Sequence, residues 1–360
     1  MGDLAINFNL PSSALGHLTS AVQFGFISGT LVFALLAIAD RFSPSKVFGL
    51  CAFVGALFNL GAIHDGNTLW TLLSLRFMTG FCLAGIYPVG MKIAADYFEK
   101  GLGKSLGYLV GALVLGTAFP HLLKGLEIGL PWRQVIMITS GLAVSGGLLL
   151  SLLVPNGPFR KTSPGIKLSA CFDVFRNKEF RAAAFGYFGH MWELYAFWVF
   201  VPMILMNHLE NHPDQQINVS LWSFVIIGFG GIACAVGGYL SEKTGPKWVA
   251  KNALLLSGLC CFLSPFVFAL SSKVLLLSFL IFWGLMVVAD SPMFSTLVAQ
   301  NAPAENKGTA LTIVNCVGFA ITIVSIQMMV ALGEVLSFQY VFILLGIGPV
   351  LGLLALRVEE

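Results

Sequence analysis

Eleven long apolar runs are the feature of this sequence that most limits its possible folds. They lie at residues 19–39, 47–63, 69–91, 105–122, 134–154, 180–206, 219–240, 250–270, 274–299, 308–332 and 336–356. Most are close to the roughly 20 residues that a helix needs to cross a bilayer. Backbone groups in lipid must pair internally, and the runs are too long and too uniformly apolar for barrel strands. The sequence therefore predicts an all-α polytopic membrane protein with these eleven transmembrane helices.

Composition supports this fold class and argues against several functions. With 57% hydrophobic and 10% charged residues, a water-soluble chain of 360 residues could not cover its surface with polar groups. The seven cysteines lie almost entirely in apolar runs without CxxC spacing, which is typical of small buried residues rather than of disulfides or zinc ligands. The sequence contains no HExxH and no phosphate-binding glycine loop. We expect no enzyme activity, cofactor, metal or nucleic-acid partner.

An internal repeat relates the first part of the chain to the second. The turn Asp40-Arg41-Phe42-Ser43-Pro44 returns as Glu242-Lys243-Thr244-Gly245-Pro246, with the order acid, base, any residue, small residue, proline. Corresponding residues are 202 positions apart in these turns and 204 positions apart in two later pairs. The pairs are Asp40 and Glu242, Pro44 and Pro246, Gly80 and Gly284, and Pro88 and Pro292. The chain is therefore predicted to consist of two homologous halves.

The halves and their orientation follow from the loops. We predict an N-terminal helical bundle at 1–154, a cytoplasmic linker at 155–179 that is rich in basic residues, and a C-terminal helical bundle at 180–360. If the first turn is cytoplasmic, sixteen of the 20 lysines and arginines lie on its side and three on the other. Positive loops stay in the cytoplasm, so the N-terminus is expected outside and the C-terminus inside. The expected location is the cell membrane, specifically a bacterial inner membrane.

These residues resemble the major facilitator superfamily of secondary transporters. The resemblance covers nearly the whole chain and includes the turn in each half, the run 76–80 (Arg-Phe-Met-Thr-Gly) followed by Ala84 and Pro88, and the basic linker. It implies two pseudo-symmetric bundles that expose a midplane site to one side at a time without ATP. It also implies a small-molecule substrate and a monomer. The turns depart from the family's usual form, with Ser-Pro and Gly-Pro where Gly-Arg-Arg-like residues are common.

The repeat and the resemblance together indicate that the first family helix is absent. The second half has six predicted spans and the first half has five. One explanation is a start codon assigned too late or a truncated gene. The other is a genuine eleven-helix form with an outside N-terminus.

The resemblance also implies a conformational gate. The gate residues would form cytoplasmic contacts between the halves in the outward-open state. They are Asp40, Arg41, Lys46, Glu242 and Lys243. The alternative is that these loop charges only set the topology.

Among the charged residues inside predicted spans, three stand out away from the span ends, where each costs several kcal/mol unless it faces a partner or water. They are Arg76, Glu193 and Asp290. In the resembling family these helices line the central cavity. Arg76 is either a packing residue that holds its half together or a part of the substrate site. Asp290 precedes Ser-Pro, which leaves a carbonyl free, so it could be a hinge, an ion site or a cap for a broken helix.

Glu193 lies in the unusual stretch 189–198, Gly-His-Met-Trp-Glu-Leu-Tyr-Ala-Phe-Trp. On a helix, His190, Glu193 and Phe197 share one face. The stretch could be an aromatic packing face. A histidine and a carboxyl together at mid-membrane could instead hold and release a proton near neutral pH. If Arg76, Glu193 and Asp290 share a cavity, one positive charge faces two negative charges. The cavity then has one excess negative charge, which favours a bound cation. We expect a proton, and sodium is the alternative.

The predicted function is secondary active transport of a small solute by alternating access, coupled to protons. The alternative is a non-transporting membrane protein, either a truncated relative or a sensor derived from a transporter. The sequence does not identify the substrate. The glycines Gly107, Gly111 and Gly116 predict close helix packing rather than an antiporter motif.

Overall fold

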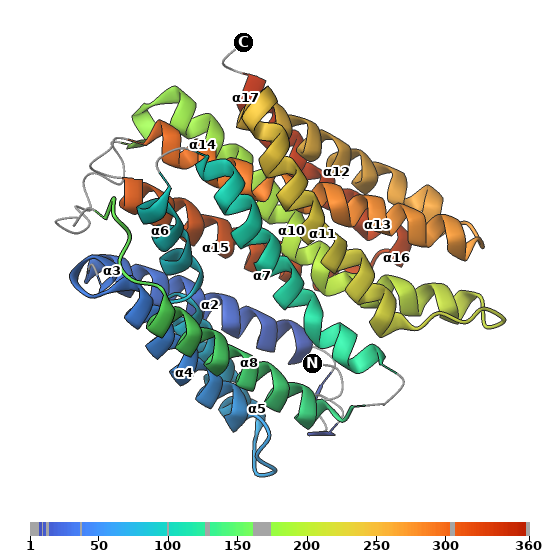
Figure 1. Cartoon of the computed structure of the whole chain (residues 1–360). Helices are drawn as coiled ribbons and strands as arrows, with labels where there is room; N and C mark the ends of the chain where they lie inside the picture. The colour runs from blue at the N-terminus through green and yellow to red at the C-terminus, as the bar shows by residue number, and fades with distance from the viewer. Residues whose placement is uncertain are drawn as a thin grey trace. The chain divides into compact units, whose positions relative to one another are not determined.

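The computed structural model describes residues 7–8, 10–11, 14–36, 38–98, 101–126, 130–160, 174–302 and 307–357. These residues form helices and contain no strand (Figure 1). The α-helices are α2 (Ala14–Leu35), α3 (Ile38–Arg41), α4 (Pro44–Gly61), α5 (Leu69–Leu83), α6 (Tyr87–Tyr97), α7 (Leu102–Gly125), α8 (Trp132–Leu153), α10 (Lys178–Asn211), α11 (Val219–Thr244), α12 (Pro246–Phe268), α13 (Lys273–Ala289), α14 (Ser291–Asn301), α15 (Lys307–Gly333), α16 (Phe338–Val341) and α17 (Ile347–Arg357). Two short 3-10 helices are η1 (Val174–Arg176) and η2 (Phe342–Gly346).

The predicted membrane spans are confirmed as helices. Within the described residues, 10 helical segments are long and apolar enough to cross a bilayer. The remaining predicted span, 19–39, coincides largely with α2, which has 22 residues. Two predicted spans each consist of two consecutive helices, α5 with α6 and α13 with α14. The chain is an all-α, multi-pass membrane protein.

The chain forms two compact units. Unit 1 comprises Met1–Lys100, Leu130–Phe172 and Pro303–Ile323, and unit 2 comprises Gly101–Gly129, Asp173–Ala302 and Val324–Glu360. Unit 2 includes α7, because α7 packs along α11. The boundaries at 154 and 179 come from the repeat and the linker in the sequence, whereas the two units are defined by contacts in space. These boundaries therefore stay a prediction. Most of the predicted linker, from 161 to 173, lies outside the described residues.

The internal repeat is visible in the packing of each unit. In unit 1, a Cβ on Gly80 of α5 would collide with the backbone carbonyl of Val22 in α2. In unit 2, a Cβ on Gly284 of α13 would collide in the same way with Ile226 in α11. The helix breaks shortly after each of these glycines, and the next helix begins with a proline in its first turn, as proline favours. Equivalent positions thus have equivalent structural roles.

Within unit 2, α7 and α11 lie side by side and antiparallel (Figure 1). A Cβ on Gly107 would lie 2.7 Å from the Cys234 carbonyl oxygen, and a Cβ on Gly111 would lie 2.8 Å from the Gly231 carbonyl oxygen. Both distances are too short for a side chain, so these two glycines allow the backbones to touch. Gly116 has no atom within 4 Å of its Cβ position and takes no part in this contact.

This difference gives a matched pair of substitutions. Gly111→Ala should destabilise the protein by about 2 kcal/mol, because the added methyl group forces α7 away from α11. Gly116→Ala should leave stability unchanged or slightly higher, because the space is open and alanine favours helix. Thermal unfolding of the purified protein in detergent measures both. Equal melting temperatures for the two variants would show that α7 and α11 do not require this close approach.

Candidate functional site

The candidate site is built on α10, the longest helix among the described residues, with 34 residues. Its first turn is fixed by the Asn177 side chain, which accepts hydrogen bonds from the backbone N–H groups of Glu179 (2.9 Å) and Phe180 (3.2 Å). Glu193 lies near the middle of this helix and is fully buried in unit 2, with an exposed fraction of 0%. A charged or neutral carboxyl at this position must find its hydrogen-bond partners within the protein.

Three donors from two other helices converge on the Glu193 carboxyl group. The indole Nε1 of Trp283 in α13 donates to Glu193 Oε1 at 2.6 Å, and the thiol of Cys261 in α12 donates to the same oxygen at 3.3 Å. The Ser257 hydroxyl, one turn earlier in α12, lies 2.9 Å from Glu193 Oε2. Both carboxyl oxygens therefore have partners, and the group links α10, α12 and α13.

The Ser257 hydroxyl has a second acceptor within reach. Its oxygen lies 3.2 Å from the backbone carbonyl of Leu254 and 2.9 Å from Glu193 Oε2. A hydroxyl carries a single hydrogen, so it can donate to only one of these groups at a time while its lone pairs accept from another donor. The site can therefore satisfy either a carboxylate, with Ser257 donating to it, or a neutral carboxyl, with Ser257 accepting from it and donating to Leu254.

A second buried pair lies one helical turn away from Glu193. His190 Nδ1 is 2.8 Å from Asp290 Oδ1, and both side chains have an exposed fraction of 0%. This contact lacks hydrogen-bond geometry, and among the described residues His190 Nε2 and Asp290 Oδ2 also have no hydrogen-bond partner. The imidazole packs near the ring of Phe294, with centroids 6.2 Å apart. The structure therefore brings together three of the predicted site residues, His190, Glu193 and Asp290, in unit 2.

The break between α13 and α14 places Asp290 in this pair. Asp290 is the last residue before α14, and its backbone carbonyl accepts from the N–H groups of Met293 (3.0 Å) and Phe294 (2.9 Å). Its side chain makes no capping hydrogen bond to α14. The helix is thus capped by the Asp290 backbone, while the carboxyl group is directed to His190.

Aromatic rings pack on the Trp283 indole that donates to Glu193. Phe197, one turn further along α10, packs on Trp283 with ring centroids 4.8 Å apart, and Phe279 packs on the same indole at 5.6 Å. Of the two alternatives for the face shared by His190, Glu193 and Phe197, aromatic packing is therefore present, and the proton role stays a prediction. The aromatic rings pack, and they also hold the indole donor against the carboxyl.

Arg76 lies in α5 of unit 1 and has an exposed fraction of 8%. Its Nη1 donates to Asn59 Oδ1 at 3.0 Å, and the Asn59 amide donates to the Ser140 hydroxyl at 2.9 Å. This chain connects α5, α4 and α8, as a packing role requires. Among the described residues, however, Arg76 Nε and Nη2 have no hydrogen-bond partner. Packing accounts for only part of this guanidinium group.

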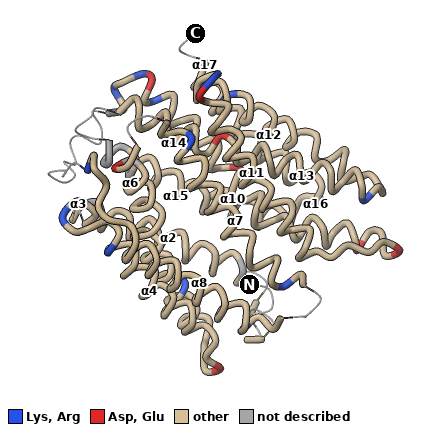
Figure 2. Tube along the Cα trace, viewed as in Figure 1, with Lys and Arg blue, Asp and Glu red and all other residues tan. Residues whose placement is uncertain are grey.

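The predicted gate residues lie at helix ends. Arg41 ends α3 and Lys46 is in the first turn of α4, both exposed, while the Asp40 side chain lies outside the described residues. Glu242 and Lys243 are exposed in the last turn of α11. Figure 2 shows the same distribution for the described chain, with charged positions mainly at helix ends and in loops. The gate itself stays a prediction.

Sequence reasoning missed the three donors to Glu193. Trp283 directly precedes the repeat glycine at 284, and Ser257 and Cys261 are polar or weakly polar residues four positions apart on one face of an apolar helix. That spacing was the available signal. Cys261 is indeed a small buried residue, as expected for the cysteines, but its thiol also donates to Glu193. Within the described residues, no group of three or more His, Cys, Asp or Glu could hold a metal ion.

The chain combines many apolar, membrane-length helices with buried ionisable residues such as Glu193 and Asp290. This combination is typical of polytopic membrane transporters. The family model of the Major Facilitator Superfamily matches residues 1–325 of the chain. The chain belongs to the Major Facilitator Superfamily, as its turns and spacing predicted. It is a multi-pass membrane protein that transports a small solute, and it is not an enzyme.

Individual comparisons agree with this assignment. The 4-hydroxybenzoate transporter PcaK of Pseudomonas aeruginosa is 23% identical over 353 residues, which cover 86% of this chain and 75% of that protein. The crystal structure of the human organic anion transporter MFSD10 (TETRAN) has a TM-score of 0.73 at 16% identity, covering 98% of this chain and 87% of that one. A crystal structure of the E. coli fucose:proton symporter FucP has a TM-score of 0.68 at 15% identity, covering 100% and 94%. The two structures show the shared fold.

Proposed function

We propose that the protein is a secondary active transporter that works by alternating access and couples solute movement to protons through Glu193. The observation that carries the proposal is the fully buried Glu193 carboxyl, whose Ser257 partner can serve it in both protonation states. A coupling carboxyl must exist in two states during one cycle. A site that leaves no polar group unpaired in either state lowers the cost of moving between them.

The surroundings of Glu193 favour a proton over sodium. A sodium ion needs several oxygen ligands, whereas the groups around this carboxyl are an indole N–H, a thiol and a hydroxyl that direct hydrogens toward it. Hydrogens directed at the carboxyl repel a metal cation. The buried pair of His190 and Asp290, one turn away, provides a second group that can receive the proton. FucP, which shares the fold, is a fucose:proton symporter.

For the substrate we propose a small organic anion. Arg76 is buried in unit 1, and two of its three nitrogen positions have no partner among the described residues. A guanidinium fork with free N–H groups is suited to a carboxylate. PcaK is named for the transport of 4-hydroxybenzoate, and MFSD10 is named an organic anion transporter. An anion with a single negative charge that moves together with a proton makes a neutral cargo, which also suits passage through an apolar protein.

Uptake into proteoliposomes tests the proposed function. Purified protein is reconstituted, and uptake of labelled 4-hydroxybenzoate is followed under an inward proton gradient, an inward sodium gradient and no gradient. We expect accumulation only under the proton gradient, and its loss when a protonophore is added. L-fucose, which has no charge, serves as the control solute. Accumulation under sodium alone would contradict proton coupling, and uptake of none of a panel of organic anions would favour a non-transporting protein.

We further propose that Asp40, Arg41, Lys46, Glu242 and Lys243 form a cytoplasmic gate and that the protein lies in the cell membrane with its N-terminus outside. A Cβ on Gly101 would lie 3.6 Å from Glu242 Oε1, so the Glu242 carboxyl lies beside the start of α7. This contact joins helices from the two sequence halves, as a gate requires. The basic-residue bias supports the orientation.

Two reporter fusions test the orientation. A reporter fused after Lys167 should be cytoplasmic, because the segment around it is rich in basic residues. A reporter inserted near Glu210, at the end of α10, should be outside. An alkaline phosphatase fusion is active only outside, and a fluorescent-protein fusion folds well in the cytoplasm, so the two reporters give opposite signals at each site. The reverse pattern would invert the proposed orientation and would place the proposed gate outside.

A further inference from the structure

A short segment that follows α8, residues 154–160, is bound to two neighbouring parts of unit 1 (Figure 1). One part is the turn between α3 and α4, and the other is the end of α6. We call this segment the strap. The transport steps proposed above do not use it, although its hydrogen bonds reach a turn that carries proposed gate residues.

Two serine side chains of the turn bind the strap. The Ser45 hydroxyl donates to the Val154 carbonyl at 2.7 Å, and the Ser43 hydroxyl donates to Asn156 Oδ1 at 2.9 Å. Ser45 has an exposed fraction of 2%, so its hydroxyl needs an acceptor within the protein. Ser43 is the N-cap residue of α4 and makes no capping hydrogen bond, although serine is well suited to that role. Its hydroxyl binds the strap instead.

The end of α6 binds the other side of the strap. The hydroxyl of Tyr97, the last residue of α6, donates to the Pro155 carbonyl at 2.7 Å. The Phe159 backbone N–H donates to the Asp96 carbonyl at 3.0 Å. A Cβ on Gly157 would lie 2.5 Å from the same Asp96 oxygen, so a glycine is needed where the strap passes α6. The strap thus joins the turn to α6 and α8.

The bonded positions of the turn alternate with proposed gate residues. Arg160 Nη2 donates to the Phe42 carbonyl at 3.0 Å, directly after Arg41. Lys46 directly follows the bonded Ser45, and the side chains of Arg41 and Lys46 are exposed. A charged side chain on a fixed backbone loses less conformational freedom on forming a contact than one on a mobile turn. The strap therefore fixes the backbone from which these charges extend.

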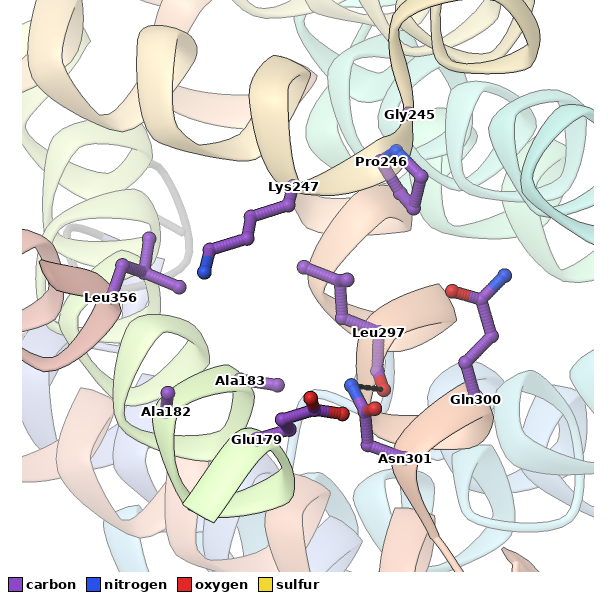
Figure 3. A pocket seen from close by; sticks show the side chains of 10 residues that line it. All are labelled: Glu179, Ala182, Ala183, Gly245, Pro246, Lys247, Leu297, Gln300, Asn301 and Leu356. Atoms are coloured by element: carbon purple, nitrogen blue, oxygen red, sulfur yellow. Dashed lines mark hydrogen bonds between the residues drawn. The ribbon is translucent and has the colours of Figure 1, made fainter. Parts of the chain in front are cut away.

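The equivalent turn of the second half is built without hydroxyl groups at these positions. Gly245 corresponds to Ser43 and Lys247 corresponds to Ser45 in the internal repeat. That turn borders an open cavity of about 310 Å³ at the ends of α10, α12, α14 and α17 (Figure 3). The repeated fold can therefore form this turn without serines that bind a strap. The serines of the first half need an explanation other than the fold.

We propose that Ser43, Ser45 and Asn156 are positioning residues of the cytoplasmic gate, which act by holding the turn between α3 and α4 against the strap. This role rests on the gate and the transport activity proposed above. Without these hydrogen bonds the turn moves more freely, so the gate contacts form less often and the carrier returns to its outward-open state more slowly. Solute binding is unchanged, because the three residues do not belong to the solute site.

Exchange of labelled 4-hydroxybenzoate in proteoliposomes tests this role. Asn156→Ala removes the acceptor of Ser43 at an exposed position, so the fold should be kept. The turnover number should fall about 5-fold with KM unchanged, which is the effect of one lost hydrogen bond. Ser43→Ala should give the same loss, and the double variant should be no slower. Ser145→Ala is the matched control, because this hydroxyl donates to the Gly141 carbonyl of its own helix, and it should behave as wild type.

Two further measurements connect the strap to the gate. Hydrogen exchange of backbone amides 41–47, followed by mass spectrometry, should be faster in Asn156→Ala than in wild type or Ser145→Ala. Asp40→Asn should slow solute exchange through the gate, and adding Asn156→Ala should slow it no further.

Two kinds of failure are distinguishable. Unchanged hydrogen exchange of the turn, an unchanged turnover number, or additive slowing by Asp40→Asn and Asn156→Ala would overturn the positioning role and leave the transport activity of the wild type standing. A wild-type protein that exchanges no organic anion would contradict the proposed function, and the positioning role with it.

Discussion

Glu193→Gln should abolish the accumulation of solute under a pH gradient while leaving exchange of solute across the membrane intact. The substitution replaces the carboxyl group, which is the part of this side chain that can bind and release a proton. Without it, the carrier can still bind solute and change conformation, but internal solute should rise only to the external concentration. Proteoliposomes loaded with unlabelled solute measure exchange, and the same vesicles with an imposed pH gradient measure accumulation.

The local structure supports glutamine as a replacement that preserves the fold. A glutamine Oε1 can accept from Trp283 Nε1 and Cys261 Sγ as the carboxyl oxygen does. The Ser257 hydroxyl can accept from the new amide nitrogen and donate to the Leu254 carbonyl, which lies 3.2 Å away. The groups that now contact Glu193 thus all keep a partner, so the expected loss is one of coupling and not of stability.

Two further variants are compared with Glu193→Gln in the same assays. Glu210→Gln changes an exposed carboxyl near the end of α10 and should have no effect. Ser257→Ala keeps the Glu193 carboxyl but removes the hydroxyl that can serve both of its protonation states, so accumulation should slow without being lost. A Glu193→Gln protein that accumulates solute with unaltered pH dependence would exclude Glu193 from coupling and leave its surroundings an aromatic packing core.

Much of the fold could be predicted from local sequence alone. A membrane span must be long and apolar, so it can be recognised from composition. A repeat with a nearly constant offset can be recognised from glycines and prolines that recur at that offset. The breaks before Pro88 and Pro292 also follow from a local rule, because proline cannot donate within a helix. These features depend on neighbouring residues along the chain, and they need no knowledge of which helices meet.

The partners of the site residues depend on packing and were not predictable in the same way. His190 and Asp290 could be named as costly residues in the membrane, but the 2.8 Å contact between them joins residues that are far apart in the sequence. The donors Trp283, Ser257 and Cys261 do not stand out among many apolar, aromatic and small residues. The sequence places Trp283 inside a span and Trp248 beside a charged turn, but it does not show which group the Trp283 indole reaches.

Breaking the His190–Asp290 pair should show strong, non-additive effects on stability. The two groups lie 2.8 Å apart with no solvent exposure, so each supplies the other's partner in a medium that solvates charge poorly. Removing one member leaves the other buried without its partner, which costs about 1–3 kcal/mol for a polar group and more for a charged one. His190→Gln and Asp290→Asn should each lower the thermal unfolding temperature in detergent by several degrees.

The double variant distinguishes a pair from two independent residues. With both groups neutral, glutamine and asparagine can hydrogen-bond to each other, and no buried charge is left alone. The double variant should therefore be more stable than the sum of the single losses predicts, with a coupling energy of about 2 kcal/mol. Gln215→Ala, which removes a half-exposed partner of His208 outside this region, should add independently to either single variant. Strict additivity of His190→Gln and Asp290→Asn would mean that the two residues do not act as one unit, and proton transfer from Glu193 to this pair would lose its receiving group.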